Sequence, residues 1–257
     1  MLLVIDIGNT NSVLGVYRGT ELIRSWRIRT ERNTTADEFN ILITSLFSAG
    51  GISMRTIRRT IVSCVVPPMV RILDDFCRQY LGHTPHWVDA RSYQRMPILL
   101  YNPHELGADR IVNAVAAYHR YRSALIIIDF GTATTFDAVS AKGEYLGGAI
   151  SPGISIAAEA LFKKASKLPR VEILRPPQQV IGKDTIESLQ SGIIFGYAAL
   201  VDGIVRRMRR EMEGPLKVIA TGGLAPLIQG VSETIETVEP DLTLAGLRLI
   251  SEQLQDA

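Results

Sequence analysis

The sequence predicts a mixed α/β protein built from two related lobes, and three observations predict it. In each half of the chain, patterns typical of strands come first and helical patterns follow. A segment of about twenty residues that begins at Val4 resembles one that begins at Ile127. The two copies lie 123 residues apart, close to half of the 257 residues of the chain. We therefore expect two duplicated domains, at residues 1–121 and 122–257.

The first lobe is expected to open with a meander of three strands. Apolar runs and turn residues indicate strands at residues 2–7, 12–17, 21–28 and 60–66. Helical spacing of apolar residues indicates helices at residues 39–47, 70–81 and 111–119. Thr35 and Glu38 have the spacing of a capping box, which is typical of a helix start. Pro67 and Pro68 end the fourth strand.

The second lobe repeats this order. The sequence ALIIID, at residues 124–129, is the most continuous strand pattern in the chain. Further strands are indicated at residues 134–140, 144–150 and 216–221, and helices at residues 156–165, 186–212 and 242–254. No linker rich in Pro, Gly or Ser separates the lobes, so we expect a packed boundary near Tyr121–Ala124.

Each of the two similar segments ends a strand with an aspartate and a glycine. VIDIGNTNSVLGVYRGTELI aligns Asp6 with Asp129 and Gly8 with Gly131 of IIDFGTATTFDAVSAKGEYL. In such a turn the backbone N–H groups can face a phosphate, and the carboxylate can position Mg²⁺ or another cation. The pair predicts a cleft that holds the phosphates of a nucleotide from both sides. The alternative is two ordinary β-turns.

Thr221-Gly222-Gly223 gives a third candidate element. A strand that runs into two glycines and then a helical segment lets the backbone come close to a nucleoside. The same pattern is also common in turns that only connect a strand to a helix. Its position after two phosphate turns favours the nucleoside interpretation.

Composition excludes several classes of protein. Apolar residues make up 46% and charged residues 21%, as in globular proteins rather than disordered or fibrous ones. The sequence contains no run of about 18 apolar residues, so no membrane helix is predicted. The N-terminus lacks the basic region of a signal peptide. Two cysteines favour a reducing cytoplasm. With a net charge of only +2, the arginine cluster at 206–210 does not predict nucleic-acid binding. We expect a cytoplasmic protein without membrane or nucleic-acid partners.

Six blocks, in order along the chain, carry a family resemblance. They are DIGNTN at 6–11, NPHELGADR at 102–110, DFGTATT at 129–135, GGAISPG at 147–153, GKDT at 182–185 and TGG at 221–223. On these blocks the sequence resembles the type III pantothenate kinases, within the actin-like ATPase superfamily that includes sugar and acetate kinases. The resemblance covers essentially the whole chain.

The resemblance implies two ribonuclease H-like (actin-like ATPase) domains that flank a nucleotide cleft. It implies ATP-dependent phosphorylation of pantothenate to 4'-phosphopantothenate, the first step of coenzyme A biosynthesis, by a homodimer that uses Mg²⁺ and K⁺ or NH₄⁺. Asp109 would be the general base, Asp6 would help to hold Mg²⁺ and the phosphates, and Asp129 would bind the monovalent cation. Nucleotide positions are Asp6, Ile7, Gly8, Asn9, Thr10, Asn11, Ser12, Val13 and Thr132. Pantothenate positions are Tyr101, Gly107, Ala108, Asp109, Arg110 and Thr185.

Chemistry gives Asp109 two possible roles. At a helix start it can simply accept backbone N–H groups, as Asp often does. In a kinase that phosphorylates an alcohol, a carboxylate orients the hydroxyl and takes its proton late, because an ordinary Asp pKa of about 4 is too low for earlier deprotonation. Arg110 can bind a substrate carboxylate with two hydrogen bonds, or form a surface ion pair.

Two other functions fit the same scaffold. In a phosphohydrolase, water would replace the alcohol at the phosphate turns; a regulatory protein would bind the nucleotide without turnover. The presence of Asp6, Asp109 and Asp129 together argues against a pure binder, because such a protein needs no positioned base. The segment 107–110 favours a pocket for an organic acid, and hence the kinase.

Overall fold

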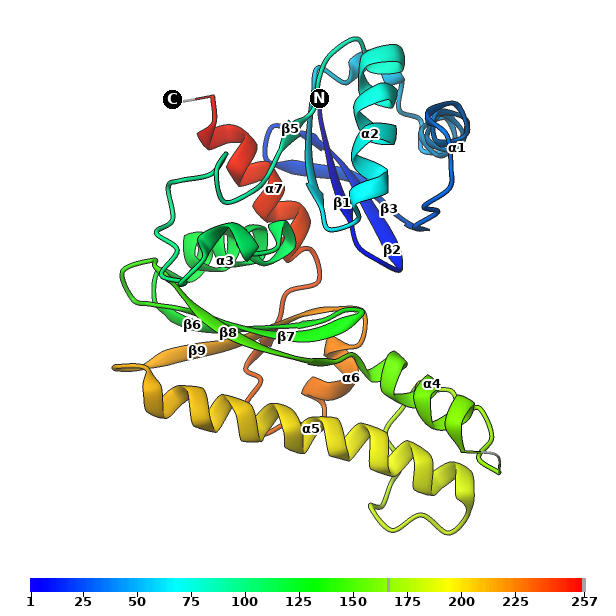
Figure 1. The fold of residues 1–257 in the computed structure, drawn as a ribbon, viewed down its shortest axis with the longest axis vertical. Coiled ribbons are helices and arrows are strands. Elements are labelled where there is room, and N and C mark those ends of the chain that lie inside the picture. Colours follow the sequence, from blue (N-terminus) through cyan, green and yellow to red (C-terminus); the bar gives the residue numbers. More distant parts are fainter. Residues whose placement is uncertain (166, 256–257) are drawn as a thin grey trace. The chain divides into compact units, whose positions relative to one another are not determined.

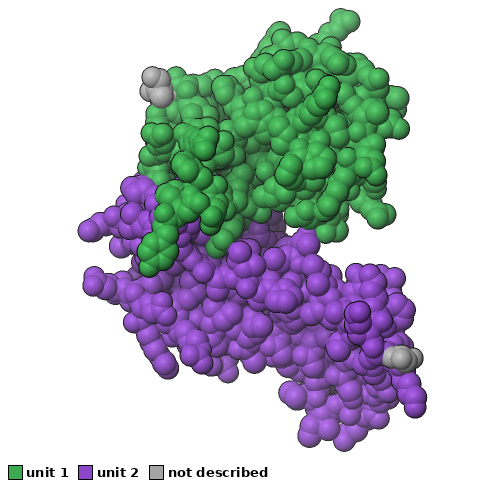
Figure 2. Space-filling view, viewed as in Figure 1, with its two compact units in different colours: residues 1–96, 101–119, 242–257 green, residues 97–100, 120–241 purple. Residues whose placement is uncertain are grey.

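The structure is a computed structural model that describes residues 1–165 and 167–255, and the chain divides into two compact units (Figures 1 and 2). Unit 1 comprises Met1–Met96, Tyr101–His119 and the segment from Leu242 on. Unit 2 comprises Pro97–Leu100 and Arg120–Asp241. This division differs from the expected boundary after residue 121, since the C-terminal segment groups with the first unit.

Packing of helix α7 (Leu242–Gln253) explains this difference. Its apolar side chains, such as Leu247 and Ile250, are fully buried. Gly246 lies so close to α3 (Ala108–Tyr121) that a Cβ would collide with the backbone of Val112. The side chain of Leu244 also comes close to Gly15 of the first sheet. Tertiary contacts therefore assign α7 to unit 1, although it follows unit 2 in the sequence.

Unit 1 contains a five-stranded sheet in the order β3-β2-β1-β4-β5. Its strands are β1 (Leu2–Ile7), β2 (Asn11–Arg18), β3 (Glu21–Arg29), β4 (Arg59–Cys64) and β5 (His86–Trp87). The first three form the expected antiparallel meander, and β4 and β5 continue the sheet in parallel. The predicted meander and fourth strand are therefore confirmed, whereas the two-residue β5 has no sequence pattern of its own.

Helices α1 (Ala36–Ala49) and α2 (Pro67–Phe76) bury their apolar residues in one core with the side chains of β1, which include Leu3 and Ile5. Thr35 and Glu38 form the predicted capping box. The helix expected over residues 70–81 is α-helical only to Phe76, because Cys77–Leu81 form a π-helical turn. Short 3₁₀ turns occur at Met54–Thr56 and Pro103–Glu105.

Unit 2 repeats the sheet of unit 1. Its order is β10-β9-β6-β7-β8, so β6 takes the central place that β1 has in unit 1. The strands are β6 (Ala124–Phe130), β7 (Ala133–Val139), β8 (Tyr145–Pro152), β9 (Leu216–Gly222) and β10 (Thr237–Val238). Again the first three are antiparallel and the last two parallel. The predicted duplicated α/β fold is confirmed.

The helices among the described residues of unit 2 are α4 (Ile154–Lys164), α5 (Thr185–Glu211) and α6 (Ala225–Gln229). One side of α5, with Ile194, Val201 and Val205, is buried against the apolar side chains of the sheet (Figure 1). By length and composition α5 could also cross a membrane, a test that core helices of globular proteins pass as well. Its packing against the sheet makes it a core helix in this structure.

Candidate active site

The first Asp-Gly turn lies between β1 and β2. Asp6 is in β1, and the Gly8 N–H donates to the Asn11 carbonyl at 3.1 Å. Asn9, Thr10 and Asn11 are exposed, whereas the side chains of Ile7 and Ser12 are buried. The turn therefore offers its backbone and the polar side chains of residues 9–11 to a ligand, and Ile7 can contribute only backbone atoms.

Thr30, which the sequence did not single out, holds this turn from the end of β3. Its hydroxyl donates to the Gly8 carbonyl at 2.8 Å and lies 2.8 Å from the Ser12 hydroxyl. Its backbone N–H donates to the Thr10 carbonyl at 3.0 Å. Arg32 adds a bond of 2.8 Å to the Asn9 side chain. Two residues that follow the meander thus fix the shape of a turn about twenty positions earlier.

The second Asp-Gly turn lies between β6 and β7 and is tighter. Ile7 and Ser12 close the first turn as a strand pair, whereas Phe130 and Thr134 close the second one. The second turn is therefore one residue shorter, and the aligned copies slip by one position after it. The Gly131 N–H donates to the Ala133 carbonyl at 3.0 Å. Thr132 and Gly131 are exposed, as a phosphate contact requires.

Glycines from two other elements pack against the second turn. The N–H of Gly153, just before α4, donates to the Thr132 carbonyl at 3.1 Å. At Gly222, where φ is +93°, a Cβ would lie 2.6 Å from the Phe130 carbonyl oxygen and 2.8 Å from Asp129 Oδ1. Unit 2 therefore brings together Asp129, Thr132 and the end of β9, which the sequence had treated as separate motifs.

The two aspartates face equivalent neighbours. Asp6 is paired in parallel register with Ser63 of β4, and Asp129 is paired with Thr221 of β9. The duplication thus extends to a hydroxyl residue beside each carboxylate. Carboxylate, hydroxyl and backbone oxygen atoms are the donors that Mg²⁺ and other hard cations prefer, and glycines leave space for them. Residues of both turns therefore fit an oxygen-bound cation beside a phosphate.

Asp109 lies at the start of α3 in unit 1. Its Oδ1 accepts the N–H of Arg110 at 2.8 Å, and Gly107 is so close that a Cβ there would lie 2.6 Å from the same oxygen. The carboxylate is half-buried. Burial raises the pKa of Asp109 above its ordinary value, although the N–H and the charge of Arg110 act in the opposite direction. This environment favours proton uptake by the carboxylate.

Val65 connects Asp109 to the first turn within unit 1. Its N–H donates to the Ile7 carbonyl at 3.1 Å, and its Cγ1 lies 3.7 Å from the position of a Cβ at Gly107. Val65, just after β4, thus lies beside both the strand that carries Asp6 and the loop that precedes Asp109. The sequence pattern did not indicate a role for Val65, because an apolar residue at the end of a strand is common and has no chemical group that points to a site.

The other predicted pantothenate positions differ in their surroundings. Tyr101 is fully exposed, Ala108 is buried and Arg110 is half-buried, all in unit 1. Thr185 is the first residue of α5 in unit 2, beside a cavity of about 430 Å³ whose lining includes Gly182, Lys183 and Asp184. Asp184 caps α5, since its side chain accepts the Glu187 N–H at 2.8 Å.

Among the described residues, no three His, Cys, Asp or Glu side chains gather into a group that could hold a metal by themselves. Nucleotide-bound Mg²⁺ is coordinated by one or two protein carboxylates together with the phosphates and water. A single aspartate in each turn fits that pattern, because the nucleotide would supply the other oxygen ligands.

Comparison with known proteins gives a consistent result. The family model described as "Type III pantothenate kinase" matches residues 2–207. A type III pantothenate kinase of Desulfatibacillum aliphaticivorans is 64% identical over 257 residues, 100% of both chains. One of Syntrophobacter fumaroxidans is 56% identical over 253 residues, 98% of both.

Solved structures share the fold at low sequence identity. A protein described as a 2-dehydro-3-deoxygalactonokinase of Sinorhizobium meliloti has a TM-score of 0.61 at 10% identity, and the match covers 100% of both chains. Its kinase fold agrees with the predicted actin-like architecture.

Proposed function

The chain belongs to the type III pantothenate kinase family, and on that premise we propose how its residues phosphorylate pantothenate in coenzyme A biosynthesis. The enzyme uses ATP, with Mg²⁺ as kinases typically do. The observation that carries the proposal is the pair of Asp-Gly turns on the central strands of two equivalent sheets.

Each of the two turns is suited to bind phosphate groups of ATP through its backbone. In the first, residues 6–13 take this role, and Thr30 keeps the turn in shape. In the second, Thr132 offers its hydroxyl and backbone from an exposed position. Asp6 would help to hold the Mg²⁺ that comes with the phosphates, and this ion would neutralise negative charge on the transferred group.

Asp129 would hold the proposed monovalent cation, K⁺ or NH₄⁺. Its carboxylate lies against the bare backbone of Gly222, where carbonyl oxygens can complete an oxygen-rich site. Gly131, two residues after Asp129, is exposed. The cation would stabilise negative charge at the second turn.

Asp109 accepts the proton of the pantothenate hydroxyl as the phosphoryl group is transferred. Arg110 binds the pantothenate carboxylate, and Gly107 and Ala108 present backbone to the rest of the substrate. Tyr101 of unit 1 and Thr185 of unit 2 are the remaining proposed pantothenate positions. The raised pKa of Asp109 supports its role, because a carboxyl whose pKa lies nearer to neutral is a better proton acceptor.

A coupled assay of ADP formation tests the proposed function. With Mg²⁺, ATP and pantothenate, we expect ADP to form only when pantothenate is present, and faster in potassium or ammonium salts than in sodium salts. No pantothenate-dependent ADP under any of these salts would refute the kinase. ADP release without an acceptor would favour the phosphohydrolase, and equal rates in all salts would refute the cation site at Asp129.

A second copy of the chain is the proposed partner, in the cytoplasm. Large apolar side chains are exposed on unit 2 along α4, before α5 and at the start of α5, namely Ile156, Leu161, Phe162, Val180, Ile181 and Ile186. Ile181 is 73% exposed. Such a collection on one unit is typical of an interface rather than a solvated surface. Both cysteines are free thiols, as in a reducing compartment.

We expect the double variant Phe162→Glu/Ile181→Glu to reduce the particle mass from about twice 28.3 kDa to a single chain. Burial of two carboxylates in an apolar interface is strongly unfavourable, which gives the expected direction. Light scattering after size exclusion measures the mass. Ile41→Glu is the control, because Ile41 is 69% exposed, close to the value for Ile181, but lies on α1 of unit 1. An unchanged mass of the double variant would contradict this interface.

A further inference from the structure

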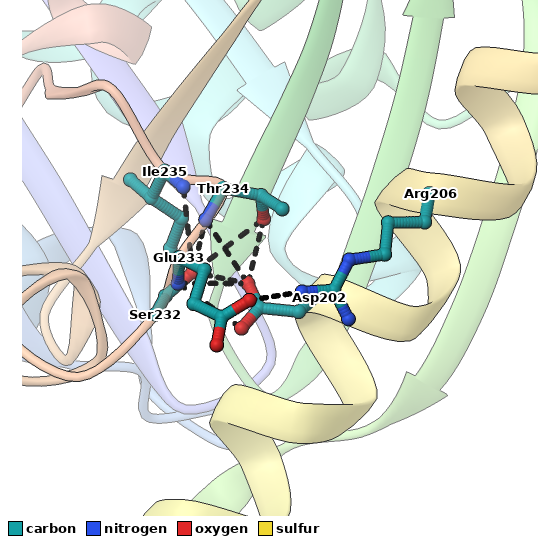
Figure 3. Close-up of polar contacts among 6 residues, drawn as sticks. All are labelled: Asp202, Arg206, Ser232, Glu233, Thr234 and Ile235. Atoms are coloured by element: carbon teal, nitrogen blue, oxygen red, sulfur yellow. Dashed lines mark hydrogen bonds and ion pairs between the residues drawn. The ribbon is translucent and has the colours of Figure 1, made fainter.

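An aspartate in the middle part of α5 accepts hydrogen bonds from several donors of one neighbouring segment (Figure 3). Asp202 is 5% exposed. It accepts hydrogen bonds from the hydroxyls of Ser232 at 2.6 Å and Thr234 at 2.7 Å. It also accepts the backbone N–H groups of Glu233 at 3.0 Å and Thr234 at 3.1 Å. All four donors come from one short segment, residues 232–234, which we call the Asp202-bound turn.

These donors keep the buried carboxylate ionised. Burial alone would raise the pKa of Asp202, but the hydrogen bonds from Ser232, Glu233 and Thr234 outweigh it and hold the pKa below its ordinary value. Hydrogen bonds to an ionised group are stronger than neutral ones. The carboxylate therefore fixes the backbone of the Asp202-bound turn to the middle of α5.

The Asp202-bound turn is continuous with α6. The N–H groups of Val231 and Ser232 both donate to the Ile228 carbonyl near the end of α6, at 3.0 and 2.8 Å. On the other side, the Glu236 N–H donates to the Val218 carbonyl of β9 at 2.9 Å. Asp202 thus anchors the connection between α6 and the edge of the sheet.

At its other end, α6 follows the glycine turn that leaves β9. Gly222 lies against Phe130 and Asp129, as described above. Around a Cβ added at Gly223, by contrast, no heavy atom of the described neighbours lies within 4 Å, so that side of the turn is open. The turn at Gly222 and Gly223 is therefore supported on one side by β6, and on the other by α6 and, through it, by Asp202.

We propose that Asp202 is a positioning residue for nucleoside binding, which it serves by fixing the Asp202-bound turn, α6 and the open glycine turn at Gly222 and Gly223. The inference rests on the proposed function, because it takes the adenosine of ATP as the group at that turn. Asp202 touches no substrate itself. Its effect is to keep α6 in one place, so that the glycine turn is ready for the nucleoside before it binds.

Surface ion pairs surround this arrangement but differ from it in kind. Arg206 of α5 pairs with Glu233, and Arg209 pairs with Glu236 at 3.4 Å. These side chains are substantially exposed, and exposed pairs contribute little to stability. The Glu233 side chain therefore provides a matched control, because its removal leaves the Glu233 N–H bond to Asp202 intact.

The test is steady-state kinetics of the full-length enzyme with ATP and pantothenate varied separately. In Asp202→Asn, an amide NH₂ group would face backbone N–H donors, and α6 would lose its anchor. We expect KM for ATP to rise on the order of tenfold, while kcat and KM for pantothenate stay within about twofold. Asp202→Glu should recover part of the ATP affinity, and Glu233→Gln should leave all three constants unchanged.

Thr234→Val provides a second, milder variant in case Asp202→Asn does not fold. It removes one donor and keeps the shape of the side chain, so KM for ATP should rise about threefold. An unchanged KM for ATP in both variants, or an equal loss in kcat and in both KM values, would overturn the inference.

Calorimetric titration of ATP separates the inference from the proposed function. If wild-type enzyme forms no pantothenate-dependent ADP, the proposed function fails; weaker ATP binding by Asp202→Asn would still support the positioning role. If wild type is active and both proteins bind ATP equally, only the inference fails.

Discussion

The variant Asp109→Asn is expected to lose turnover by a factor of about 10²–10⁴, while its affinity for ATP barely changes. An amide has the size of the carboxylate and can still accept the Arg110 N–H, but it cannot take the proton of the hydroxyl. Single-turnover ADP formation and calorimetric ATP titration measure the two effects. Turnover near that of wild type would refute Asp109 as the base.

Loss of folding stability should not account for the lower turnover of Asp109→Asn. The pKa of Asp109 is raised by burial, so the folded state binds the proton more tightly than the unfolded chain does. The carboxylate therefore costs stability as pH rises from the ordinary Asp pKa through the raised value. A neutral amide avoids that cost, and Asp109→Asn should be at least as stable as wild type near pH 7.

Asp89→Asn is the matched control for turnover. Asp89 also accepts backbone N–H groups, from Arg91 and Ser92 in a surface turn, and its replacement should leave turnover unchanged.

The same shift predicts the acid side of the pH profile. A protonated Asp109 cannot accept a proton, so kcat/KM for pantothenate should fall as pH falls through its raised pKa. The fall should therefore occur at a higher pH than the ordinary value of about 4. A profile that stays flat down to pH 4 would show that a different group, or none, accepts the proton.

The variant Gly222→Ala is expected to lose about 2–5 kcal/mol of unfolding free energy and most ATP binding. A non-glycine residue at φ +93° is strained, and its Cβ would lie 2.6 Å from the Phe130 carbonyl oxygen and 2.8 Å from Asp129 Oδ1. Relief of these contacts must move either β6 or the Asp129 carboxylate. Urea unfolding followed by circular dichroism measures the loss.

Gly223→Ala is the control, because it adds the same methyl group one residue later, into open space. It should cost less than about 1 kcal/mol of stability. If the nucleoside binds at this turn, the added Cβ should nevertheless raise KM for ATP. Equal stability of Gly222→Ala and wild type would contradict the close approach at Gly222.

Local patterns predicted most of the fold because most strands and helices show their apolar periodicity within a short stretch of sequence. The strand at 2–7 and the capping box at Thr35 are confirmed at the same residues. The π-helical turn at Cys77–Leu81 could not be predicted, since apolar spacing continues through it unchanged. The place of α7 depends on contacts such as Gly246 with Val112, which are distant in sequence.

The candidate site divides in the same way. Asp6, Gly8, Asp109 and Asp129 stand in patterns whose chemistry is readable from sequence. Thr30 and Val65 do not, because a threonine after a strand and a valine at a strand end occur in many contexts. Their roles come from pairing of strands, which brings positions about twenty or more apart into contact.

The grouping of α7 with unit 1 has a consequence for biosynthesis. The segment from Leu242 on leaves the ribosome only after every residue of unit 2. Until then β1 and β4 lack the helix that buries Leu247 and Ile250. Unit 2, whose residues are continuous apart from Pro97–Leu100, can therefore fold during translation. Unit 1 is synthesised first but acquires α7 only after unit 2 has been synthesised.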